Sequence, residues 1–176
     1  INSVRTGAAD CSVIVLEEGT LKEYVDIPGY IWQKWKDGII PNAHFADIVR
    51  LRLLIAYGGV WLDAETYYTG KKLPYYLQSR LFAFAVDPFH RGIEPRINAN
   101  SIMASDPNDR ILIYVDAILE EYWRHESGLM DWLIFHLVWR MVIKENFEEL
   151  KEELMELRMQ VNLESYIRYF FNNFIR

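Results

Sequence analysis

Residues 43–65 of the chain read Ala43-His-Phe-Ala-Asp-Ile-Val-Arg-Leu-Arg-Leu-Leu-Ile-Ala-Tyr-Gly-Gly-Val-Trp-Leu-Asp-Ala-Glu65. If the segment 43–57 is helical, apolar residues occupy much of its circumference, which predicts a helix that is buried on more than one side. The glycine pair at 58–59 ends this helix and permits a tight turn. The apolar residues 60–62 then predict a short strand that runs into Asp63.

Four charged residues in this block are candidates for chemistry. Asp47 and Arg50 are three residues apart, so they share one face of the predicted helix. Asp63 and Glu65 end the predicted strand, whose period of two places both carboxylates on one side. Carboxylates are hard ligands for Mg²⁺ or Mn²⁺, which one or two of them can hold together with substrate phosphates. Such an ion would stabilise a departing diphosphate, while Asp47 and Arg50 could hydrogen-bond sugar hydroxyls.

Each of these features also has a purely structural explanation. An aspartate–arginine pair at this spacing is most often a surface salt bridge, Asp-x-Glu occurs by chance in many chains, and Gly-Gly is most often a turn. Their order within one short block favours a functional interpretation, because helix, glycine turn, strand and carboxylates follow one another directly. At Gly59 the missing side chain would also let a ligand approach the backbone closely.

The rest of the chain predicts strands that alternate with helices in its first part and only helices in its last part. Apolar or β-branched runs predict strands, the first of them buried, at 12–16, 81–86 and 97–105. Short helices are expected at 21–25 and 30–36, and beyond Asp109 apolar residues recur with a period of 3.6 up to Met141. A charged amphipathic helix is expected at 146–158, followed by an aromatic-rich tail at 163–175 that either docks onto the domain or lies on a membrane surface.

This order predicts one α/β domain over residues 1–176, with a mixed part at 1–105 and a helical part at 106–176. The 51% hydrophobic and 15% aromatic content excludes a disordered chain. The net charge of −6 and the absence of a lysine–arginine cluster argue against nucleic acid as a partner. The single cysteine, Cys11, cannot form an internal disulfide, and no run of about 18 apolar residues predicts a membrane span.

The block resembles the glycosyltransferases of the capsular polysaccharide synthesis family. Its pattern of Ala-Asp-x-x-Arg followed by Tyr-Gly-Gly-Val-Trp-Leu-Asp is shared with that family and, more distantly, with sugar transferases that carry a DxD motif and with glucosylating bacterial toxins. Weaker similarity covers flanking segments at Tyr24–Pro28, Lys71–Pro74 and Asp131–His136. The initial strand typical of the family has no counterpart before Ile1, so we expect that strand to be missing from this chain.

The resemblance implies a GT-A-like nucleotide-sugar fold that transfers a hexose from a UDP- or GDP-sugar to a saccharide acceptor in capsule or cell-surface polysaccharide synthesis. Residues 1–105 would then form the nucleotide-sugar part. Asp63 and Glu65 would be the catalytic pair that holds Mn²⁺ or Mg²⁺ and the donor diphosphate, while Asp47, Arg50 and Gly59 would contact the donor sugar. The resemblance further implies a cytoplasmic location, with peripheral association at the inner face of the membrane as one option.

Five other polar residues are candidates for the acceptor site or the cleft around it. Each has an ordinary alternative as a satisfied core residue or a solvent-facing side chain. They are His44, Asn98, Asn100, Asp131 and His136. The six tryptophans are predicted to serve core packing. Two other functions remain open on the sequence alone: a metal-dependent nucleotide-sugar hydrolase, and a non-catalytic module that binds sugar nucleotides or supports assembly.

Overall fold

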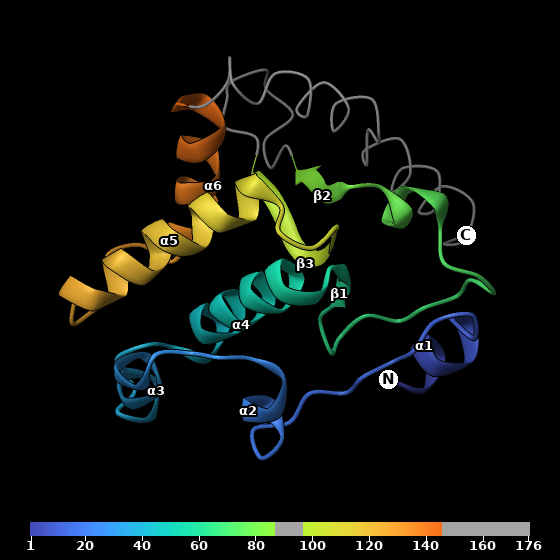
Figure 1. Cartoon of the computed structure of the whole chain (residues 1–176), viewed down its shortest axis with the longest axis horizontal. Coiled ribbons are helices and arrows are strands. Elements are labelled where there is room, and N and C mark those ends of the chain that lie inside the picture. The colour runs from blue at the N-terminus through green and yellow to red at the C-terminus, as the bar shows by residue number, and fades with distance from the viewer. Residues whose placement is uncertain (87–96, 146–176) are drawn as a thin grey trace, which may run out of the picture.

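The structure is a computed structural model that describes residues 1–86 and 97–145 (Figure 1). Within these ranges, helices surround one small sheet. The elements in chain order are α1 (Asn2–Gly7), α2 (Leu21–Tyr24), α3 (Gly29–Lys36), α4 (Asn42–Tyr57), β1 (Gly59–Leu62), the 3-10 helix η1 (Tyr75–Gln78), β2 (Leu81–Val86), β3 (Ile97–Ser105), α5 (Arg110–His125) and α6 (Ile134–Glu145). The helix predicted at 146–158 and the aromatic tail lie outside the described residues.

The sheet has the strand order β1-β3-β2, and both neighbouring pairs are antiparallel. β1 pairs with the second half of β3, from Gly59 opposite Ser105 to Leu62 opposite Ile102. The pairing of β2 with β3 is irregular, because the register shifts between Ala83 and Phe84. Such an irregularity bends a strand and re-aims its side chains.

Helix α4 lies at the centre of the molecule, between α5 on one side and α2 and α3 on the other (Figure 1). Its residues Leu51 and Leu54 belong to a core shared with β3, α5 and α6, while its residues Phe45 and Ile48 belong to a second core with α2 and α3. This confirms the prediction of a helix buried on more than one side. Each fully buried side chain of this kind contributes about 1.5–3 kcal/mol of hydrophobic stabilisation.

Helix α5 contributes side chains to both cores. Asp109 caps its first turn by accepting hydrogen bonds from the backbone N–H groups of Ile111 and Leu112. Arg52 of α4 donates to Asp116 at 3.3 Å and also pairs with Glu120, both on α5. These interactions fix α4 against α5 and so hold the start of α4 in place beside β1.

The prediction of a strand at 12–16 is wrong. These residues have no regular secondary structure, and Ile14 is 56% exposed. A β-branched run forms a strand only where another strand accepts its hydrogen bonds, and the described sheet consists of β1, β3 and β2.

The coarse prediction of an α/β protein is confirmed, and residues 110–145 are helical apart from the connection between α5 and α6. Among the described residues, we find no helix that combines the length and the hydropathy needed to cross a membrane.

Candidate functional site

The α4–β1 connection brings the start of α4 and the end of β1 together. The chain reverses at Gly58, so β1 runs back along α4. Gly58 lies eleven positions after Asp47 along the helix, a rise of about 16 Å at 1.5 Å per residue. Asp63 lies five positions after Gly58 along the extended segment, also about 16 Å at 3.3 Å per residue. Because the two lengths are equal, Asp63 returns to the level of Asp47 and Arg50.

The reversal depends on glycine. Gly58 has a φ of 67°, which favours glycine, and a Cβ placed there would lie 2.8 Å from both Ser105 O and Pro107 Cδ. Gly59 has a φ of 89°, and a Cβ placed there would meet no atom of the described residues within 4 Å. The structure thus confirms the predicted tight turn and shows that the backbone of β3 is what approaches it.

Arg50 is the centre of the site. Its guanidinium donates one hydrogen bond to Asp47 Oδ1 at 2.5 Å and another to Asp63 Oδ1 at 3.0 Å. The side chain is buried, and its guanidinium lies 5.2 Å from the ring of Trp61 and 6.0 Å from the ring of Phe135. A planar guanidinium suits this arrangement, since it can bind two carboxylates while its faces contact aromatic rings.

Asp47 is a buried carboxylate with two donors on one oxygen. Besides Arg50, the side-chain amide of Asn100 donates to Asp47 Oδ1 at 2.7 Å, which brings β3 into the site. Burial raises the pKa of Asp47 to about 6, and the nearby positive charge of Arg50 limits the rise. Asp47 therefore keeps its proton to a higher pH than an exposed aspartate does.

Asp63 is the more accessible carboxylate of the pair. Trp61 Nε1 donates to Asp63 Oδ1 at 2.6 Å, and the backbone N–H of Asp63 donates to Ser101 O at 2.9 Å. The side chain is 37% exposed. Within residues 1–86 and 97–145, no hydrogen-bond donor reaches Asp63 Oδ2. One oxygen is thus held in position while the other is open to a ligand.

Glu65 does not share a strand with Asp63. The prediction that the strand period of two places both carboxylates on one side is therefore wrong. β1 ends at Leu62, and residues 64–65 form a turn closed by a hydrogen bond from Thr66 N to Asp63 O at 2.9 Å. Glu65 is exposed at this turn. In the part of the chain that the structure describes, no group of three or more His, Cys, Asp or Glu side chains is arranged to hold a metal ion.

Gly59 lies at the opposite end of β1 from Asp63, paired with Ser105. Gly59 lies four positions before Asp63, which corresponds to about 13 Å of extended chain. The structure therefore does not bring Gly59 to the cluster around Arg50.

His44 lies beside Asp47 and is buried. Its Nδ1 is 3.7 Å from Asp47 Oδ2, which is too long for a hydrogen bond, and neither ring nitrogen has a partner among the described residues. Burial lowers the pKa of His44. Its ring packs against that of Trp132 in a T-shaped arrangement, with ring centroids 5.0 Å apart. The prediction that His44 lines the same site as Asp47 and Arg50 agrees with this position.

The other predicted candidates separate into different roles. Asn100 joins the cluster, as described above. Asn98 lies on β3, paired with Ala85, and its side chain lies outside the described part of the structure. Asp131 caps the turn before α6, since its side chain accepts from Leu133 N at 2.7 Å. His136 is half-buried on α6, with its ring 5.6 Å from that of Phe135.

Three aromatic residues at the site were not predicted to belong to it: the two tryptophans were predicted to serve core packing, and Phe135 was not singled out. Trp61 and Phe135 contact the guanidinium of Arg50, and Trp132 contacts His44. The strand period of two gave a signal for Trp61, which precedes Asp63 by two residues. The only signal for the other two was the weak family similarity of the segment Asp131–His136, which contains both of them.

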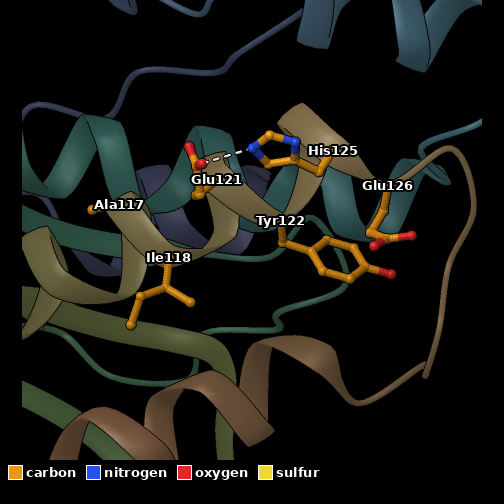
Figure 2. Close-up of a pocket in the computed structure, with 6 residues that line it drawn as sticks. All are labelled: Ala117, Ile118, Glu121, Tyr122, His125 and Glu126. Carbon is orange, nitrogen blue, oxygen red and sulfur yellow. Dashed lines mark hydrogen bonds and ion pairs between the residues drawn. The ribbon is translucent and has the colours of Figure 1, made fainter.

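A shallow depression of about 460 Å³ lies elsewhere, along the second half of α5 (Figure 2). Its lining residues come from the second half of α5 and from Glu126 directly after it, and two of them, Glu121 and His125, pair with each other at 2.8 Å. It shares no residue with the cluster around Arg50. Because its polar groups do not converge on the open space, we do not assign a function to it.

The fold and the site define an α/β protein in which a buried arginine links two aspartates from consecutive elements. Residues 1–173 match the sequence model of the family described as capsular polysaccharide synthesis protein, and the chain belongs to this family. Searches of curated proteins and of solved structures found no match. The family membership confirms the resemblance seen in the sequence and indicates a role in capsule biosynthesis.

Proposed function

We propose that the chain is a glycosyltransferase that moves a hexose from a UDP- or GDP-sugar to a saccharide acceptor, on a GT-A-like fold and with the help of Mn²⁺ or Mg²⁺. The observation that carries this proposal is the position of Arg50, which is held between a buried aspartate and an accessible one. The cluster combines a guanidinium donor with carboxylate acceptors, of which Asp63 is accessible, and recognition of sugar hydroxyls requires both kinds of group.

Within this proposal, Asp47 and Arg50 bind the transferred sugar. Asp47 accepts hydrogen bonds, and Arg50 donates them. The contacts with Asn100, Trp61 and Phe135 support their orientation, because they hold both side chains in place before a ligand arrives. Preorganised groups of this kind need little rearrangement as charge develops during the reaction.

The metal would be held by Asp63, with Glu65 as a second ligand from the exposed turn. Asp63 fits this role because its Oδ1 is fixed by Trp61 and Arg50 while its Oδ2 is open among the described residues. One or two carboxylates together with substrate phosphates are enough to hold Mg²⁺. When bound, the ion would offset the charge of the nucleoside diphosphate as it leaves.

The direct test is sugar transfer by an Asp63→Asn variant, which keeps the size of the side chain and its contacts. Alanine is less suitable, because it would leave Arg50 and Trp61 Nε1 without their shared acceptor. We expect turnover to fall by about a hundredfold or more, since charge stabilisation by one group is commonly worth that much. The matched control is Asp106→Asn, an exposed aspartate just after β3. Equal turnover in Asp63→Asn and the wild type would refute the proposal.

A second experiment measures thermal unfolding with a panel of UDP- and GDP-sugars, each with and without Mn²⁺. A ligand at a hundredfold excess over its Kd stabilises the folded state by about 2.7 kcal/mol. We expect one nucleotide class to stabilise the protein much more with Mn²⁺ than without it, and the difference to be smaller in Glu65→Gln. Analysis of the products with and without a saccharide acceptor separates transfer from hydrolysis, and binding without any turnover would indicate a non-catalytic module.

A further inference from the structure

Trp132 is an unusually accessible tryptophan at the edge of the candidate site. It lies in the connection between α5 and α6 and is 63% exposed. Single exposed apolar residues are common on protein surfaces and need no explanation by themselves. Trp132 differs because its ring has a fixed neighbour inside the site: it packs against the ring of His44 at an interplanar angle of 77°.

Two independent contacts join this connection to the cluster. His44 links Trp132 to Asp47, with His44 Nδ1 3.7 Å from Asp47 Oδ2. Three residues after Trp132, Phe135 contacts the guanidinium of Arg50. The position of the exposed ring beside the carboxylate cluster therefore follows from packing on both sides of it.

The order of contacts places Trp132 away from the metal end of the site. Asp63 contacts Arg50, Arg50 contacts Asp47, Asp47 lies beside His44, and His44 contacts Trp132. Under the proposed function, the diphosphate belongs at Asp63 and the transferred hexose at Arg50 and Asp47. A group bound at Trp132 would then lie beyond the hexose, on the side from which an acceptor must approach.

We propose that Trp132 is an acceptor-binding residue that stacks against a pyranose ring of the saccharide acceptor; this assignment rests on the proposed function for its orientation. The face of an aromatic ring carries partial negative charge, which attracts the weakly positive C–H groups on the apolar face of a sugar ring. The stack also removes apolar surface of the indole from water. Ring hydroxyls at the rim of the sugar would stay available for polar contacts.

His44 supports a polar ligand at this position. Both of its ring nitrogens are buried without a partner among the described residues, whereas most buried polar atoms in proteins have one. Trp132 covers this histidine, and an exposed side chain can change rotamer on a picosecond to nanosecond timescale. A sugar hydroxyl or a bridging water that reached His44 next to the stacked ring would provide the missing partner.

The binding test does not depend on turnover. The indole N–H signal of Trp132 is assigned in an NMR spectrum of the full chain by its loss in Trp132→Phe. Methyl glycosides of glucose, galactose, mannose and N-acetylglucosamine are then added separately at high millimolar concentration. We expect at least one to shift this signal, and we expect the shift to persist in Met130→Ala, a control for an exposed apolar residue in the same connection. The absence of a shift with all four glycosides would overturn the proposal.

The kinetic test uses the glycoside that shifts the signal as the acceptor. We expect Trp132→Ala to raise the acceptor KM about tenfold, the scale of one aromatic contact with its buried area, while kcat and the donor KM stay within about twofold. Trp132→Phe should restore most of the affinity. An indole shift without sugar transfer would refute the proposed function and leave the saccharide site standing. Transfer with an unchanged acceptor KM in Trp132→Ala, or a shift produced by UDP-glucose alone, would refute the acceptor assignment.

Discussion

Arg50 neutralises part of the negative charge of two carboxylates, Asp47 and Asp63, which would otherwise repel each other. Asp47 is 7% exposed and Arg50 is 3% exposed, so the pair between them is shielded from water. Removing one partner of such a pair leaves a buried charge without compensation, which is more costly than losing a surface salt bridge. The stability of the start of α4 therefore depends on this one side chain as much as the chemistry does.

We expect Arg50→Ala to lower the free energy of unfolding by about 3–5 kcal/mol. The matched variant is Arg124→Ala, which removes an arginine that also binds two carboxylates, Glu120 and Glu121, but is 49% exposed. For an exposed ion pair we expect a loss below about 1 kcal/mol. Chemical denaturation of both variants measures the difference, and equal losses would contradict the buried charge assignment.

The raised pKa of Asp47 predicts a pH dependence with a definite sign. Between pH 3.8 and about 6, the folded protein keeps a proton on Asp47 that the unfolded chain has lost. The stabilising contribution of Asp47 to the free energy of unfolding is therefore largest at low pH and is lost as the pH rises through 6. His44 acts in the opposite direction, because its lowered pKa removes stability as the pH falls below 6.5.

Comparison with Asp47→Asn isolates the aspartate, since His44 is present in both proteins. A rise of about two units in the pKa of Asp47 corresponds to on the order of 3 kcal/mol of free energy of unfolding. We expect the stability of the wild type relative to Asp47→Asn to decrease by about this amount between pH 3.5 and pH 7. Urea denaturation across this range measures it, and a difference that stays constant or grows with pH would contradict the prediction.

At the scale of the elements, the reversal between α4 and β1 sets the geometry of the site. We expect Gly58→Ala to be strongly destabilising, by about 2–3 kcal/mol or more, because φ is positive and the new Cβ would meet the backbone of β3 and Pro107. Gly59→Ala should lower the free energy of unfolding by about 1 kcal/mol, since the new Cβ would meet no atom of the described residues there and only the positive φ is unfavourable. Denaturation midpoints compare the two, and a milder effect at Gly58 would contradict this account.

The sequence was sufficient to predict elements whose evidence is local. The range of β3 was predicted at 97–105, and α4 was predicted within one residue, because a long apolar periodic segment with glycines at its end specifies a helix and its termination. The segment 12–16 failed because strand formation depends on a partner elsewhere in the chain. The placement of Glu65 on the strand failed for a related reason: the strand period was extended past Leu62, where the backbone already turns.

The candidate site was predictable where its members come from one short segment. Asp47, Arg50 and Asp63 meet because helix rise and strand rise compensate over a known number of residues. The contacts of Phe135 and Trp132 were not predictable, because they depend on how α6 packs after a connection whose path no local pattern specifies. His44 was ambiguous in the sequence, and only its position beside Asp47 distinguishes it from an ordinary core histidine.

At the scale of the whole molecule, charge predicts an unusual salt response. The chain carries a net charge of −6, and the proposed site holds three of its carboxylates against one arginine. Without a divalent metal, an anionic nucleotide sugar is repelled both locally and by the whole chain. Salt screens this repulsion, with a Debye length near 10 Å at 0.1 M.

We expect the affinity for UDP-glucose in EDTA to increase by about two- to threefold when NaCl is raised from 20 to 200 mM. With Mn²⁺ present, the same change should weaken binding, because the bound cation reverses the local sign. Calorimetric titration under the four conditions tests this. Weakening by salt in EDTA would show that an unrecognised positive region guides the nucleotide.

The matched lengths of α4 and β1 also restrict how the chain can change in size. One residue added within β1 would displace Asp63 by about 3.3 Å and turn its side chain to the other face of the sheet. One residue added within α4 after Arg50 would rotate Asp47 and Arg50 by about 100° relative to the glycine turn. The segment that follows Asp63 has no such requirement, since residues 67–74 form no helix or strand. Insertions are therefore tolerable after the turn at Glu65 but not in the sixteen positions from Asp47 to Leu62.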